Sequence, residues 1–252
     1  MNWARFYAYA KTFFETEGIP GGAVIVVQGG AVMLAEGFGR RDVAAAKAVT
    51  PDTIFGIASL TKSFTSLALL MLAAEGRLEL DDPLRTYLPT FRYPGLGKGD
   101  GEDVKLWHAA SHTSGVPPLP GLSYALRPSQ TGDPGERYLR EYPSVPALQT
   151  TADLLGFLAA QAAPPVGAPG QVVSYQNDVY GLLGAVVETV SGLPYAQSIG
   201  ERILVPLGMS RSTFDPVRAG ATSPRFTPKI LRDACTPRRS GNTRLHIWRR
   251  GS

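Results

Sequence analysis

Residues 59–76 read SLTKSFTSLALLMLAAEG, and this stretch has the pattern of a helix. Apolar side chains recur at positions 60, 64, 67, 68 and 71, which is the spacing of one helix face. Gly76 is a residue that commonly ends a helix, because it adopts a left-handed backbone without strain. We therefore predict one long, mostly buried helix directly after Ser59.

The residues before this helix predict a shorter helix and a β-hairpin. Residues 1–17 are rich in aromatic side chains but interrupted by charges, a pattern typical of a helix and not of a signal peptide. The β-branched run 23–27 and the apolar run 31–35 are separated by Gly29-Gly30, which indicates a hairpin. We expect the glycines and charged residues of 37–42 to close it.

The residues after the long helix predict further helices separated by loops. Ten of the 21 prolines lie in residues 116–170, which predicts a loop-dominated region apart from a helix near 151–161. Helical spacing predicts a short helix over 104–110, a long one over 179–191 that ends at Gly192, and one more over 196–205.

Composition and charge restrict the function classes. The 252 residues are 44% hydrophobic, enough to bury a core, and the one cysteine excludes a disulfide framework and a CxxC metal or redox site. Residues 223–252 hold eight bases and one acid, so the net charge of +4 belongs to this tail and residues 1–222 are slightly acidic. We therefore expect no nucleic-acid partner. We also expect no membrane span and, by default, a cytoplasmic protein; the sequence predicts no oligomeric state.

Ser59 and Lys62 are candidate catalytic residues. On a helix these positions share one face, with a rise of about 4.5 Å between them. A hydroxyl at a helix N-terminus beside a partly desolvated amine suits a nucleophile and its base. The alternative interpretation is that Ser59 merely caps the helix.

Tyr175 and Asn177 are a second candidate pair. They lie in a stretch predicted to be extended, where residues two apart point the same way, so a phenol and a carboxamide can face one pocket. A phenol acts as a base at neutral pH only beside a cation such as Lys62. The alternative is that Tyr175 fills the core and Asn177 forms an Asx turn or caps the next helix.

His108 and His112 have the spacing of two metal ligands on one helix face, but the sequence offers no convincing third ligand. No HExxH glutamate lies between them, and His246 is in the basic tail. We expect no metal, and expect His112 to satisfy loop backbone.

Four motifs follow one another in a fixed order over residues 18–215. They are Phe55-Gly56-Ile57-Ala58-Ser59-Leu60-Thr61-Lys62, Ser111-His112-Thr113-Ser114-Gly115, Tyr175-Gln176-Asn177 with Tyr180-Gly181-Leu182-Leu183-Gly184, and Pro206-Leu207-Gly208-Met209. In order and spacing they resemble the class C type of the serine beta-lactamase family, which includes penicillin-binding DD-peptidases and related esterases.

The resemblance implies an α+β fold, in which an antiparallel sheet flanked by helices lies beside a helical lobe. It also implies a serine hydrolase: Ser59 is the nucleophile, Lys62 and Tyr175 share the acid and base roles, and Asn177 contacts the substrate amide. An acyl-enzyme would form on a lactam, peptide or ester carbonyl, with no cofactor or metal. The partner would be a small-molecule or peptide acyl substrate. The alternative is a catalytically silent domain that binds peptides or peptidoglycan.

One family feature is missing. The family's third motif, Lys or His followed by Thr or Ser and then Gly, lies on a late strand; Arg239-Ser240-Gly241 imitates it only in letters, with no strand pattern around it. We therefore expect an incomplete sheet and impaired activity, because one oxyanion-hole donor is lost. We expect residues 1–222 to form the hydrolase domain and residues 223–252 to be an irregular or disordered tail, produced by truncation or a frame shift.

Overall fold

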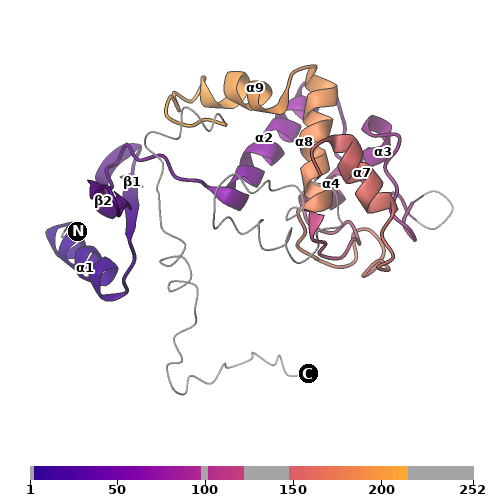
Figure 1. The fold of residues 1–252 in the computed structure, drawn as a ribbon. Helices are drawn as coiled ribbons and strands as arrows, with labels where there is room; N and C mark the ends of the chain where they lie inside the picture. The colour runs from indigo at the N-terminus through magenta and orange to yellow at the C-terminus, as the bar shows by residue number, and fades with distance from the viewer. Residues whose placement is uncertain (1–2, 98–101, 122–147, 215–252) are drawn as a thin grey trace, which may run out of the picture. The chain divides into compact units, whose positions relative to one another are not determined.

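The computed structural model describes residues 3–97, 102–121 and 148–214, which form two compact units (Figure 1). One unit extends to Ile54, and the other begins at Phe55. The described residues contain helices and a three-stranded antiparallel sheet that is not closed. The predicted α+β class is therefore confirmed. Among these residues, no helix combines the length and the apolar character needed to cross a bilayer.

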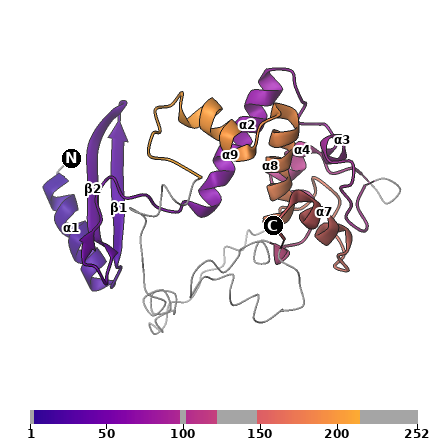
Figure 2. The ribbon, with the colours of Figure 1, turned by 45° about the horizontal axis from the view of Figure 1, so that its top comes forward.

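The first unit is a hairpin with a helix packed on one face (Figure 2). Helix α1 (Trp3–Thr16) precedes strands β1 (Gly21–Gln28) and β2 (Ala31–Asp42), which pair antiparallel. Gly29 and Gly30 join the strands with φ of 58° and 78°, as a tight primed turn requires, so the predicted hairpin is confirmed.

Strand β2 is longer than predicted, because its charged end pairs with a further strand. Strand β3 (Lys47–Ala48) pairs with Arg40 and Asp42, so residues 37–42 continue the sheet and do not close the hairpin. On the covered face, the Phe14 and Phe38 rings stack with centroids 5.2 Å apart. A side chain at Gly22 would collide with Phe14, so glycine permits this close approach of helix and strand.

The second unit is helical and is organised around two long neighbouring helices, α2 (Thr61–Ala74) and α8 (Asp178–Ser191). Both were predicted from apolar spacing. Gly76 and Gly192, with φ of 67° and 74°, end them in the left-handed conformation expected of helix-ending glycines. The core side chains that are essentially inaccessible to solvent include Leu69, Leu72, Leu158, Leu182, Leu183 and Ile199.

Shorter helices complete this unit. They are α3 (Leu84–Tyr87), α4 (Leu106–Ala110), α7 (Thr151–Ala159) and α9 (Tyr195–Ile199). The helix predicted over 196–205 is present over residues 195–204, but at Gly200 its hydrogen bonding changes from α9 to a π-type turn, η2 (Gly200–Leu204), in which the Val205 N–H bonds to the Gly200 carbonyl. The division at residue 222 stays a prediction, and the basic tail with Arg239-Ser240-Gly241 lies outside the described residues.

Candidate active site

Ser59 lies in a 3₁₀ turn, η1 (Ala58–Leu60), that leads directly into α2. The residue at the cap position of α2 is Leu60, and no side chain caps this end, so the helix-cap interpretation of Ser59 is wrong. Ala58 has φ of 44°, a left-handed conformation that is uncommon and costly for a residue with a β-carbon. The backbone is thus strained at the residue before the hydroxyl.

Lys62, one helical turn further along, places its ammonium beside this hydroxyl. Lys62 Nζ lies 3.1 Å from Ser59 Oγ and donates to Asn177 Oδ1 at 2.7 Å. It also lies 4.9 Å from the centroid of the Tyr175 ring and 5.3 Å from that of Tyr180, within the range of cation–π attraction. The predicted shared face of Ser59 and Lys62 is therefore present, and the amine is held from several sides.

Tyr175 reaches the same hydroxyl from the irregular segment before α8. Its phenol donates to Ser59 Oγ at 2.7 Å across a separation of 116 residues. The side chain is 51% exposed, so it does not fill the core. Hydrogen bonding to Lys62, and then to Ser59, holds the pKa of Tyr175 below its ordinary value of 10.0.

Asn177 occupies the cap position of α8, yet its side chain does not cap the helix. Its carboxamide oxygen accepts from Lys62 instead, while Gln176 does the capping: Gln176 Oε1 accepts from the Val179 N–H at 2.7 Å. The cap interpretation of Asn177 is therefore wrong. Sequence reasoning missed the role of Gln176, for which the signal was a polar side chain three residues before the first buried apolar position.

Lys62 and Tyr175 thus contact the Ser59 hydroxyl, and Asn177 joins this group through its bond with Lys62. Ser59, Lys62 and Asn177 line a hollow of ≈ 630 Å³, together with Tyr180 and Thr65. An amine and a phenol within hydrogen-bond reach of one hydroxyl can accept its proton and return it to a leaving group. The arrangement can therefore support nucleophilic chemistry at Ser59.

Tyr180 fixes this arrangement, although the sequence analysis gave it no role of its own. Its hydroxyl donates to the Lys62 carbonyl at 3.0 Å and lies 2.6 Å from Ser66 Oγ. The signal that could have identified it is its position three residues after Asn177, on the same face of α8.

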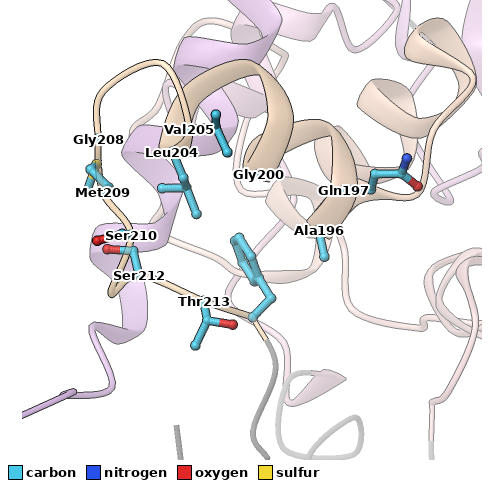
Figure 3. A pocket seen from close by; sticks show the side chains of 11 residues that line it. Ala196, Gln197, Gly200, Leu204, Val205, Gly208, Met209, Ser210, Ser212 and Thr213 are labelled. Atoms are coloured by element: carbon cyan, nitrogen blue, oxygen red, sulfur yellow. The ribbon is translucent and has the colours of Figure 1, made fainter. Parts of the chain in front are cut away.

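A second hollow, of ≈ 640 Å³, lies beside α9, η2 and the segment that follows them (Figure 3). Its lining is apolar or uncharged, with Leu204, Met209 and Phe214 beside Gln197 and the hydroxyls of Ser210 and Thr213. None of the described residues that line it has a titratable side chain, so the hollow at Ser59 has the stronger claim to chemistry.

The two histidines do not share a helix face. Helix α4 ends at Ala110, and His112 follows it with φ of 59°. His108 Nδ1 accepts from the Lys105 N–H at 3.0 Å, within the helix's own capping arrangement. His112 contacts the segment around Tyr175, as was expected of a residue that satisfies loop backbone. Within the described residues, no group of three or more His, Cys, Asp or Glu side chains could hold a metal.

Comparison with known proteins agrees with this geometry. A family model described as Beta-lactamase matches residues 6–242. The protein Flp of Staphylococcus aureus strain MW2 is 31% identical over 198 residues, which is 78% of this chain and 35% of that protein. Penicillin-binding protein 4* of Bacillus subtilis strain 168 is 27% identical over 207 residues, or 81% of this chain and 41% of that protein.

A solved structure gives the same result. The octameric penicillin-binding protein homologue from Pyrococcus abyssi matches with a TM-score of 0.73 and 32% identity, covering 87% of this chain and 46% of that one. This chain spans between about a third and two fifths of the length of these curated relatives. Because the family model covers nearly the whole chain, this protein belongs to the beta-lactamase family of serine hydrolases.

Proposed function

We propose that this chain is a serine hydrolase that forms an acyl-enzyme at Ser59 on a lactam, peptide or ester carbonyl. The observation that carries the proposal is the double contact at Ser59 Oγ, which lies 3.1 Å from Lys62 Nζ and 2.7 Å from the Tyr175 hydroxyl. These distances are those of a nucleophile and its proton acceptors before a substrate binds.

In the proposed reaction, Ser59 Oγ forms a bond to the substrate carbonyl carbon while its proton passes to the Lys62–Tyr175 pair. The bond from that carbon to the leaving nitrogen or oxygen then breaks, and the same pair returns the proton to the leaving group. Water later attacks the ester and restores Ser59. Lys62 and Tyr175 contact the same oxygen, so the proposal assigns the Ser59 proton to the pair and not to one member of it.

Asn177 is proposed to act in two ways. Its oxygen orients the Lys62 ammonium at 2.7 Å, and its amide nitrogen is available to bind a carbonyl oxygen of the substrate. The N-terminal end of α2 adds a partial positive charge where negative charge develops on the substrate.

The substrate class follows from the relatives only in outline. Two of them are named as penicillin-binding proteins or their homologues, which makes β-lactams and peptides the first candidates, with simple esters as less demanding probes. Acylation in a single turnover measures the proposed step at Ser59 directly, without dependence on the later release of the acyl group.

The test is covalent labelling of the intact chain. The wild type, Ser59→Ala and a matched control, Ser63→Ala, are incubated with a fluorescent penicillin, an activated phosphonate and a p-nitrophenyl ester, and the mass of each protein is measured. Ser63 is an exposed residue in the first turn of α2, which follows the η1 turn that holds Ser59. We expect one added acyl or phosphonyl group on the wild type and on the control, and none on Ser59→Ala.

Two results would contradict the proposal. Labelling of Ser59→Ala to the same extent as the wild type would place the nucleophile elsewhere. Failure of every reagent to label the wild type, in a preparation whose circular dichroism shows folded helices, would favour the silent peptide-binding domain.

A further inference from the structure

His112 is attached to the residues on both sides of Tyr175. Its backbone carbonyl accepts from the Ser174 N–H at 2.8 Å, and its Nδ1 accepts from the Gln176 N–H over a longer 3.5 Å. The left-handed φ of 59° at His112 allows one residue to present its carbonyl and its side chain to the same segment. The residues before and after Tyr175 are thus both bonded to His112.

The imidazole also supports the phenol ring directly. The His112 and Tyr175 rings lie 4.3 Å apart between centroids, and the His112 and Tyr180 rings 5.0 Å. Tyr180 is in turn hydrogen-bonded to the backbone of Lys62. A continuous series of contacts therefore runs from α2 through Tyr180 and His112 to the face of Tyr175, whose hydroxyl meets Ser59.

One of these contacts, from the Gln176 N–H to Nδ1, requires that Nδ1 carry no proton. Because Nδ1 accepts from Gln176, the single ring proton of the neutral form is on Nε2. A second proton on Nδ1 would face the Gln176 N–H and would place a positive charge near the Lys62 ammonium. Burial, and then the Lys62 charge, lower the pKa of His112, and the backbone contact with Gln176 opposes them in part.

The other titratable groups around the ring do not compensate for such a charge. Lys62 on α2 opposes a second proton on the His112 ring, and the groups that contact this ring are the aromatic rings of Tyr175 and Tyr180. His108, which precedes His112 in the sequence, accepts a hydrogen bond from the Lys105 N–H. Among the described residues, no carboxylate contributes to the lowered pKa of the His112 imidazole or opposes it.

We propose that His112 is a positioning residue for Tyr175, and that it holds the phenol against Ser59 only while its imidazole is neutral. This proposal rests on the function proposed above. It implies that the Ser111–Gly115 turn controls the position of the Tyr175 phenol in acidic solution, in addition to its role in loop structure. Protonation of His112 would release the phenol and slow acylation at Ser59, with no change at the nucleophile itself.

Two variants separate the ring from its charge. His112→Asn keeps an acceptor oxygen and tolerates a left-handed backbone, but it has no aromatic ring and does not titrate. His112→Phe keeps a ring, but it has no acceptor and does not titrate. His108→Asn is the matched control, because His108 lies one turn earlier and accepts a backbone hydrogen bond away from Tyr175.

The first readout is the second-order rate of phosphonate labelling at Ser59 between pH 5 and pH 8. In the wild type and in His108→Asn we expect the rate to fall in acid, with an inflection below the ordinary histidine pKa of about 6.5. In both His112 variants this inflection should disappear. At neutral pH the loss of the ring in His112→Asn should slow labelling by about two- to tenfold, the equivalent of one aromatic contact. An unchanged acid inflection in His112→Asn would overturn the proposal.

A second readout does not depend on activity. Tyrosine labelled with ¹³C at Cζ gives one resonance for Tyr175, which is assigned by its absence in Tyr175→Phe. We expect this resonance to move in the wild type over the pH range in which the His112 ring titrates, and to stay fixed over that range in His112→Asn. If the wild type resists phosphonate but shows this movement, the proposed function fails and the positioning role stands. A Tyr175 resonance that ignores the titration of His112 refutes the positioning role, whatever the labelling shows.

Discussion

Replacing Asp178 by asparagine is expected to stabilise the helical unit at neutral pH. Asp178 is the first residue of α8 and is only 2% exposed. Within the described residues neither carboxylate oxygen has a well-formed hydrogen bond, although the backbone amides of Asp178 itself and Gly121 lie close enough to lower its pKa somewhat. Burial dominates and raises the pKa of Asp178 from 3.8 to about 6.

The magnitude and its sign follow from this pKa. The rise from 3.8 to about 6 corresponds to up to about 3 kcal/mol, since each pKa unit is worth about 1.4 kcal/mol. Below pH 3.8 both the folded and the unfolded chain carry the proton. Between pH 3.8 and about 6 only the folded chain keeps it, so the Asp178 contribution to stability falls as pH rises through this window.

The introduced asparagine carries no charge at any of these pH values. The Asp178→Asn chain should therefore match the wild type near pH 4 and exceed it by up to about 3 kcal/mol at about pH 7.5. The measurement is urea unfolding at several pH values, combined with hydrogen exchange of peptides from α8, which reports on this helix directly.

Asp153→Asn is the matched control, with the opposite expected sign. Asp153 is exposed and accepts from the Gln149 and Thr150 N–H groups at the start of α7, and these bonds lower its pKa. Its stabilising contribution is present above pH 3.8 and is lost as the pH falls through its lowered folded value. The reasoning about Asp178 is refuted if Asp178→Asn is less stable than the wild type at neutral pH, or if the difference between them does not change with pH.

Three further substitutions test the site and the packing beneath it. Lys62→Met should slow phosphonate labelling of Ser59 by about 10²-fold or more, measured as a rate at neutral pH, because the hydroxyl loses one of its two proton acceptors. Gly115→Ala should destabilise the chain by more than about 1 kcal/mol in urea unfolding, because φ is 83° and a β-carbon would collide with the Gly167 carbonyl. Leu158→Ala should cost about 2–5 kcal/mol in the same assay, since this side chain is fully buried.

The long elements were predictable because each follows from a local pattern. The apolar spacing of α2 and α8, each ended by a glycine, determines where these helices lie, and the structure moves the start of α8 only from residue 179 to Asp178. Apolar runs around Gly29-Gly30 likewise determine the hairpin. In these cases the residues that form the element also carry its signal.

Two very short elements, α3 and β3, could not be predicted, because their stability comes from partners elsewhere in the chain. Helix α3 has four residues, too few for any periodicity, and its Leu84 N–H bonds to the Val104 carbonyl. Strand β3 has two residues and exists through its pairing with β2. The change from α-type to π-type hydrogen bonding at Gly200 is also not specified by apolar spacing alone.

The contacts of the candidate site also differ in how well the sequence predicts them. The contact between Ser59 and Lys62 follows from helical spacing, but the approach of Tyr175 to Ser59 spans 116 residues and was expected only from the family resemblance. The contacts of His112 with this segment were harder still to predict, because no sequence rule assigns a left-handed backbone to a histidine. A role that depends on one residue's φ becomes visible only in three dimensions.

The proposed chemistry at Ser59 depends on how accurately α2 and α8 are aligned along their common interface. Lys62 bonds to Asn177 at 2.7 Å, and Tyr180 bonds to the Lys62 carbonyl at 3.0 Å. A slide of one helix by a single residue, about 1.5 Å, would lengthen or misalign both bonds and so weaken them, because hydrogen bonds are sensitive to distance and angle. The apolar core between the helices, with Leu69 and Leu183, prevents such a slide. Buried leucines far from the hydroxyl therefore contribute to the distance between the amine and the nucleophile, and this distance connects the stability of the fold to the proposed reaction.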